Sequence, residues 1–92
     1  MDNRQYSIVR MLESQDMDGN IRFDGYQDAA GPFTEQFSAY VAGCLVPATD
    51  RWDMFVRCEF GEPNEYGMRD VEYEHLEDMI ERHEAMAENV VL

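Results

Sequence analysis

Residues 16–26 read DMDGNIRFDGY, and the path of the chain through them decides how its first third folds. Asp, Gly and Asn dominate the first half of this stretch, and all three are residues that form tight turns. The same residues occur in calcium loops, in which carboxylates alternate around a glycine. The stretch therefore has two readings, as an ion site or as a reversal of the chain.

An alignment with the EF-hand calcium loop on Gly19 separates the two readings. Asp16 and Asp18 then fall on ligand positions. The final position, which requires a bidentate Glu, is occupied by Gly25, and Arg22 brings a cation into the loop. The stretch keeps the turn-forming half of a calcium loop and lacks the half that closes on the ion. We therefore predict a turn between a helix and a strand, or a hairpin, with no metal or cofactor.

The spacing of apolar residues on either side of this turn predicts a small α+β domain. We expect one domain, over 1–92, of two or three short antiparallel strands packed with about three helices. The β-branched part of the first segment also permits a strand. The expected elements are a helix over 3–14, a strand over 21–23, a loop over 27–31, a helix from Gly31-Pro32 to Pro47, a strand over 51–60, an extended segment over 66–68 and a helix over 71–88 capped by Asp70.

The second predicted helix carries a broad apolar arc, which we expect to face the core. Ala39 and Gly43 lie away from this arc. Cys44 lies within the arc and Cys58 in the apolar pattern of the 51–60 strand, so we expect two buried thiols, with a disulfide or a reactive thiol as the alternative. The arc consists of Phe33, Phe37, Tyr40, Val41, Cys44 and Leu45.

The composition restricts the partners that the protein can bind. Its 92 residues include 20 acids and 7 bases, all Arg, for a net charge of -13. An apolar fraction of 45% indicates a folded globule. Such a charge repels nucleic acids and anionic membranes and attracts basic protein surfaces. The N-terminus has no apolar run of signal-peptide length and no segment is long enough to span a membrane, which indicates a cytoplasmic protein.

The last predicted helix separates apolar from acidic side chains. Neighbouring carboxylates on its acidic side would stand about 5–6 Å apart, which destabilises an isolated helix. This side can be a solvated outer face, or a binding surface whose carboxylates roughly follow the spacing of phosphates along a nucleic acid. Under the second reading, the partner-binding residues are Glu74, Glu77, Asp78, Glu81, Glu84 and Glu88.

No motif for catalysis occurs in the sequence. Nucleotide-binding loops, nucleophile elbows and zinc-protease motifs are absent. His75 and His83 are eight residues apart and lie on different sides of the predicted helix, whereas zinc ligands are usually closer. We therefore expect a protein that is not an enzyme.

In its length, its charge and its acidic helix, the chain resembles the small inhibitors that phages encode against host defence, such as anti-CRISPR proteins and nucleic-acid mimics. The resemblance implies a partner that is a nucleic-acid-binding complex with a basic groove, in the cytoplasm of the host. It also implies a mechanism of steric and electrostatic occlusion without turnover. The alternatives are a salt-adapted domain, to which the absence of Lys is suited, and a regulatory adaptor that binds a basic protein segment.

Overall fold

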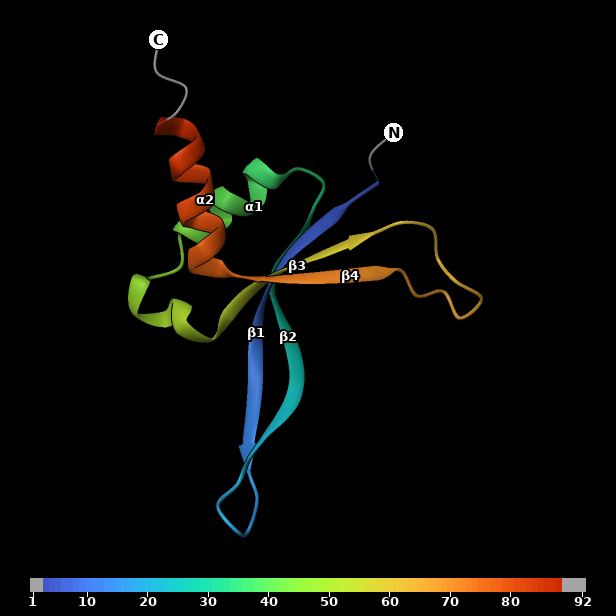
Figure 1. Cartoon of the computed structure of the whole chain (residues 1–92), viewed down its shortest axis with the longest axis vertical. Helices are drawn as coiled ribbons and strands as arrows, with labels where there is room; N and C mark the ends of the chain where they lie inside the picture. The colour runs from blue at the N-terminus through green and yellow to red at the C-terminus, as the bar shows by residue number, and fades with distance from the viewer. Residues whose placement is uncertain (1–2, 89–92) are drawn as a thin grey trace.

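The computed structural model describes residues 3–88, although not the side chain of Glu88, and shows a four-stranded antiparallel sheet with helices on one face (Figure 1). The strand order is β2-β1-β3-β4. The α+β class is confirmed, but the predicted two or three strands are too few. The elements are β1 (Gln5–Gln15), β2 (Ile21–Phe33), α1 (Gln36–Cys44), the 3-10 helix η1 (Ala48–Asp53), β3 (Met54–Phe60), β4 (Asp70–His75) and α2 (Leu76–Glu88).

The first two strands form a long hairpin, so the helix predicted over 3–14 is wrong. The strand contains four consecutive buried residues, Tyr6, Ser7, Ile8 and Val9. Because both faces of the strand are covered here, the polar–apolar alternation that usually identifies a strand is absent. The DMDGN stretch is the tip of this hairpin. Of the two predicted alternatives, a turn between a helix and a strand or a hairpin, the hairpin is confirmed. Figure 1 shows the hairpin projecting away from the helices.

The second strand is far longer than the short strand predicted at 21–23. It continues through the predicted loop at 27–31 and includes Pro32, so the expected start of a helix at Gly31-Pro32 is wrong. Gly31 has a φ of +108°, and a Cβ there would lie 2.9 Å from the Tyr6 carbonyl oxygen. Glycine is therefore needed at the register shift where the last residues of β2 pair with the first residues of β1, and the chain becomes helical only at Gln36.

The third strand is confirmed over most of its predicted length, and the strand that follows it replaces the start of the predicted last helix. Residues 51–53 belong to η1, and residues 66–68 lie in the connection between β3 and β4. In β4, Val71 and Tyr73 alternate with acidic residues and pair with Glu59 and Arg57 of β3. Because alternation with β-branched and aromatic residues favours a strand, the helix begins only at Leu76.

The core lies between the sheet and the helices. The sheet contributes Tyr6 and Ile8 of β1 and Met54 and Val56 of β3, whose side chains alternate toward the same face. The helices contribute Ala39, Leu76, Met79 and Ile80. Leu76 is fully buried, which fixes the start of α2 against the sheet.

The face of the sheet that lacks helices is covered by aromatic rings. The rings of Tyr26 and Tyr73 stack with centroids 4.2 Å apart, although their strands are at opposite edges of the sheet. Three strand spacings in a flat sheet would separate them by about 14 Å, so the sheet must curl strongly. Phe55 contacts Tyr26 edge-on, and Val9, which pairs with Phe55, is fully buried. The second face therefore forms a small core of its own.

Candidate functional site

The acidic face of α2 contains most of the residues predicted to bind a partner. Glu77, Asp78, Glu81 and Glu84 are all exposed on this helix. Glu88 is the last residue of α2, and its side chain lies outside the described part of the structure. The helix wheel places these residues opposite Leu76, Met79 and Ile80, which are buried. The structure thus brings four of the six predicted carboxylates together on one outward surface.

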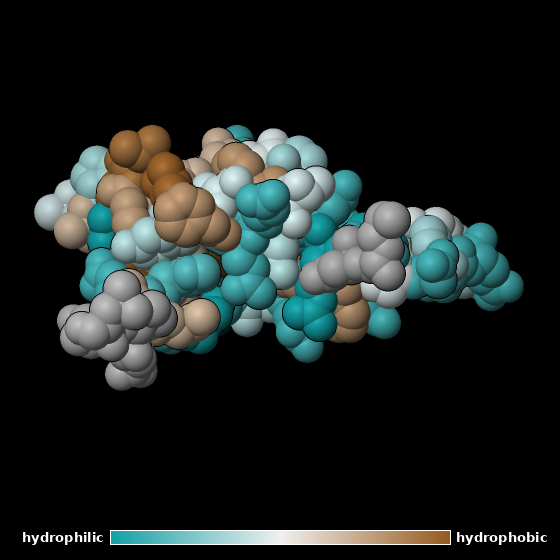
Figure 2. Space-filling model, turned by 90° about the horizontal axis from the view of Figure 1, so that it is seen from above, coloured by the Kyte–Doolittle hydropathy of each residue, from teal (hydrophilic) through white to brown (hydrophobic). Residues whose placement is uncertain are grey.

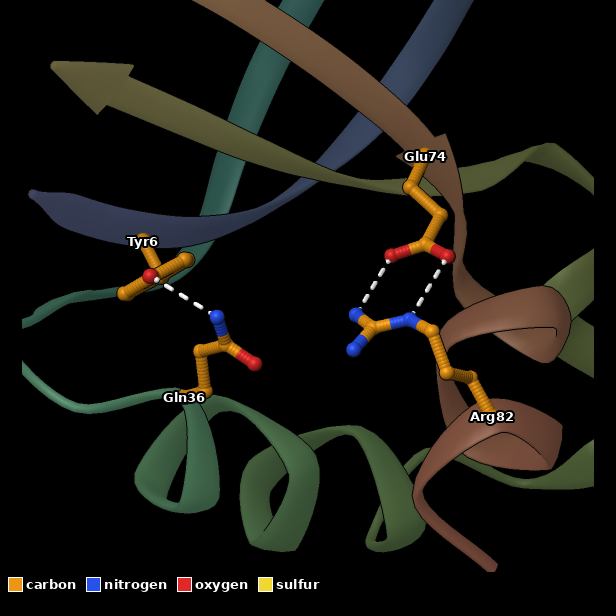
Figure 3. A network of polar contacts seen from close by, with 4 residues as sticks. All are labelled: Tyr6, Gln36, Glu74 and Arg82. Carbon is orange, nitrogen blue, oxygen red and sulfur yellow. Dashed lines mark hydrogen bonds and ion pairs between the residues drawn. The ribbon is translucent and has the colours of Figure 1, made fainter. Parts of the chain in front are cut away.

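Glu74 does not belong to this surface, because it lies in β4 rather than on the helix. Its carboxylate accepts two hydrogen bonds from Arg82 of α2, at 3.2 Å from Nε and 2.9 Å from Nη2 (Figure 3). This bidentate ion pair raises the pKa of Arg82 above its usual value. The prediction that Glu74 lies on the acidic face of the last helix is therefore wrong, because α2 begins only at Leu76.

The ion pair with Glu74 makes Arg82 unavailable to the carboxylates of α2. Arg82 lies four residues after Asp78, a spacing at which it could neutralise that carboxylate. Instead it is held by Glu74. Among the ion pairs of residues 3–88, none involves Glu77, Asp78, Glu81 or Glu84. The acidic face of α2 therefore keeps its charge unbalanced within the described structure.

A cavity of about 380 Å³ lies between the sheet and the two α-helices, a volume within the range of small-molecule sites. Figure 3 shows two polar pairs at this cavity, Glu74 with Arg82 and Tyr6 with Gln36, whose amide nitrogen donates to the Tyr6 hydroxyl at 3.1 Å. In both pairs the polar groups are bonded to each other across the helix–sheet boundary. The pairs therefore join the helices to the sheet.

The two α-helices contact each other through aromatic rings. Tyr40 of α1 stacks on His83 of α2 with ring centroids 5.0 Å apart. A hydrogen bond with Cys44, burial and the charges of Cys44 and Glu84 raise the pKa of Tyr40. Burial, followed by the charge of Arg82, lowers the pKa of His83. Tyr40 thus lies at the contact between α1 and α2, within the electrostatic reach of Glu84.

The apolar arc of α1 faces outward, so its prediction as core is wrong in part. Phe37, Val41 and Leu45 are 65%, 44% and 80% exposed, whereas Ala39 and Gly43 are buried. A Cβ on Gly43 would lie 2.8 Å from Leu76 Cδ1, so only a small residue allows α1 to approach α2 this closely. Ala39 and Gly43, four residues apart, were the signal in the sequence that could have identified the buried side.

The two cysteines are both thiols, and their environments differ. Cys44 is exposed on the outward side of α1, so the expectation that it is buried is wrong. Cys58 is half-buried and packs against the core.

The hairpin tip is closed by its own hydrogen bonds. One carboxylate oxygen of Asp16 accepts hydrogen bonds from the backbone N–H groups of Asp18 and Asn20, both at 2.9 Å. Gly19 has a φ of +87°, which suits a glycine. The carboxylate that a calcium loop would use as a ligand therefore stabilises the turn. Residues 3–88 contain no group of three or more His, Cys, Asp or Glu side chains arranged to hold a metal ion.

No protein-family model, curated protein or solved structure matches the chain. Within the described residues, none of the helices combines the length and the apolar character that crossing a bilayer requires.

Proposed function

We propose that this chain is a non-enzymatic binding protein that docks on the basic surface of a nucleic-acid-binding protein and blocks it. The observation that carries the proposal is the unbalanced acidic face of α2, in which Glu77, Asp78, Glu81 and Glu84 are exposed while Arg82 is bonded to Glu74. The proposed site of action is the cytoplasm, which is the host cytoplasm if a phage encodes the chain.

The physical basis of this function is the relief of repulsion between like charges. Glu77 and Glu81 are four residues apart, and Glu81 and Glu84 three, so each pair destabilises the helix by a few tenths of a kcal/mol. Arg and Lys side chains of a partner would replace that repulsion with attraction. The charge of the whole chain would also steer the partner toward it, so association should slow as salt rises.

The proposal is tested with a variant that removes three charges from α2, Glu77→Gln, Glu81→Gln and Glu84→Gln. The immobilised wild-type protein is exposed to proteins from the source cells that bind heparin, a fraction rich in basic grooves. We expect it to retain a nucleic-acid-binding protein that added DNA or RNA displaces. The α2 variant should retain this protein at least about tenfold more weakly at low salt, because charge pairs at an interface contribute several kcal/mol together.

A control variant removes three charges far from α2, through Glu62→Gln, Glu65→Gln and Asp70→Asn, in and beside the connection between β3 and β4. Figure 1 shows this connection at the opposite side of the molecule from the helices. The control should retain the partner nearly as well as the wild type. Equal losses in both variants, or a captured protein that nucleic acid does not displace, would contradict docking through α2.

A further inference from the structure

The face of the sheet that lacks helices carries a row of aromatic rings that contact one another across the strands. The ring centroid of Tyr26 lies 5.2 Å from that of Phe23 and 4.2 Å from that of Tyr73. Phe55 completes the row, at 5.7 Å from Tyr26. Phe23 and Tyr73 are 55% and 43% exposed. Single exposed apolar residues are common on protein surfaces, but a connected row of rings marks a binding site, which we call the aromatic face.

The curl of the sheet makes the aromatic face concave. Tyr26 belongs to β2 and Tyr73 to β4, which are the outer strands of the sheet. Their rings stack on the side without helices, so both outer strands bend toward this side. Ile21 and Val71, in the same two strands, are 70% and 43% exposed and extend the apolar surface beyond the rings. A segment of another chain that lies in this hollow would therefore reach rings from both strands.

Carboxylates outnumber cations on the aromatic face. Glu13 lies directly opposite Phe23 in the register of β1 and β2, and side chains at opposite positions share a face. Of the arginines in the strands of the described structure, the registers place only Arg57 on this face. Arg57 is already occupied, because it lies 2.8 Å from Asp28 and 3.2 Å from Glu59. The rings are thus bordered by an excess of negative charge.

We propose that the aromatic face binds arginine side chains of an extended segment of a partner protein. The guanidinium group is planar and cationic, so it stacks on an aromatic ring and is attracted to the carboxylates beside it. In an extended chain every second residue points to the same side, at intervals of about 7 Å, which lets two arginines reach Phe23 and Tyr73, the rings that adjoin Tyr26. Because α2 packs on the other face of the sheet, the inference goes beyond the proposed function and does not depend on it.

Charge decides between such a segment and a single-stranded nucleic acid. Rings on an open sheet stack on unpaired bases where cations beside them hold the phosphates. Here the strand arginine on the face is held by carboxylates, and a net charge of -13 repels phosphates. The same charge opposes a second copy of the chain. The occupant that complements both the rings and the charge is therefore a protein segment that carries arginine.

The test uses a fluorescent synthetic peptide of about 11 residues in which Arg alternates with Thr, so that all Arg side chains lie on one side of the extended chain. A peptide with Lys in place of Arg has the same charge and serves as its control. Fluorescence anisotropy with the full chain at about 0.15 M salt should show at least about fivefold tighter binding of the Arg peptide, because Lys stacks less well on rings. Equal affinities would overturn the inference, since net charge alone would then explain the binding.

A ring variant, Phe23→Leu with Tyr73→Leu, removes the two exposed rings and keeps apolar bulk. It should bind the Arg peptide at least about fivefold more weakly than the wild type does and should bind the Lys peptide nearly as well. Phe23→Leu alone lies in the projecting hairpin, away from the core between sheet and helices, so it provides a folded variant if the double substitution unfolds the protein. This single variant should weaken the Arg peptide at least about twofold.

The matched control removes two exposed rings elsewhere. Figure 2, which looks down on the helical end of the molecule, shows an apolar patch there that is separate from the aromatic face. Phe37 of α1 is 65% exposed, and Tyr66 in the connection between β3 and β4 is 78% exposed. Phe37→Leu with Tyr66→Leu should bind both peptides like the wild type. Equal losses in the control and the ring variant would contradict the inference.

The outcomes separate this inference from the proposed function. The α2 variant described above should bind both peptides more weakly and keep the preference for Arg, because it retains the rings. A ring variant that keeps this preference would refute the inference, whatever protein the α2 face captures. Tighter binding of a single-stranded DNA of about 12 thymidines than of the Arg peptide would instead assign the face to nucleic acid. Sedimentation velocity should give a monomer, and a dimer that the ring variant dissociates would assign the face to a second copy.

Discussion

At the scale of single residues, His83 couples stability to pH. Its pKa is lowered from the usual value of 6.5, first by burial, so the folded protein favours the neutral ring more than the unfolded chain does. The stability that this preference provides is complete above about pH 6.5 and is lost as pH falls through the folded pKa. His83→Phe keeps an aromatic ring beside Tyr40 and removes the titration. We therefore expect the variant to gain stability relative to the wild type as pH falls below 6.5.

Urea unfolding at a series of pH values between about 5 and 8 measures this difference, because the two free energies of unfolding can be subtracted at each pH. The carboxylates titrate alike in both proteins and cancel in the subtraction. A difference that stays constant across the range would show that the fold does not suppress protonation of His83.

At the scale of elements, the placement of α1 depends on its small residues. The helix lies against α2 through Gly43, where a Cβ would approach Leu76 Cδ1 to 2.8 Å and Met79 Cε to 3.3 Å. Leu76 is fully buried and has little room to move. Gly43→Val should therefore destabilise the protein by about 1–3 kcal/mol through overpacking, although removing a helical glycine is favourable by itself.

A neighbouring substitution controls for the effect of valine on helix formation. Cys44→Val lies on the exposed side of the same helix and should cost no more than about 1 kcal/mol, the usual contribution of its hydrogen bond with Tyr40. Chemical unfolding of both variants gives the comparison. Equal effects at the two positions would show that α1 does not approach α2 as closely as Gly43 allows.

At the scale of the whole molecule, a net charge of -13 should make stability depend on salt. Repulsion between the acids is strongest at low ionic strength and is screened within about 10 Å at 0.1 M. The midpoint of thermal unfolding should rise as salt increases from about 0.02 to 0.5 M, and it should rise less in the α2 variant, which has fewer like charges. Scanning calorimetry at a series of salt concentrations measures the unfolding midpoints of the wild type and of the α2 variant. A protein that unfolds below molar salt would instead support the salt-adapted alternative.

The sequence predicted those elements whose two faces differ clearly in polarity. The β3 strand alternates, α2 separates apolar from acidic residues from Leu76 onward, and the turn residues at Asp16 identified the hairpin tip. The β1 strand was mistaken for a helix because residues on both of its faces are buried. The boundary of β4 was missed because its acids continue into those of α2, which hides the change from strand to helix.

The sequence by itself determined the α+β class, the excess of negative charge and the outward direction of Glu77, Asp78, Glu81 and Glu84. These follow from composition and local spacing, since a carboxylate stays in water unless a partner compensates its burial. Only the tertiary structure decided that Glu74 holds Arg82 and that α1 turns Phe37, Val41 and Leu45 outward. Both results depend on contacts between segments far apart in the chain. The small residues Ala39 and Gly43 let α1 pack closely, and this packing leaves the larger apolar side chains exposed. The spacing of apolar residues within α1 does not indicate which side of the helix packs in this way.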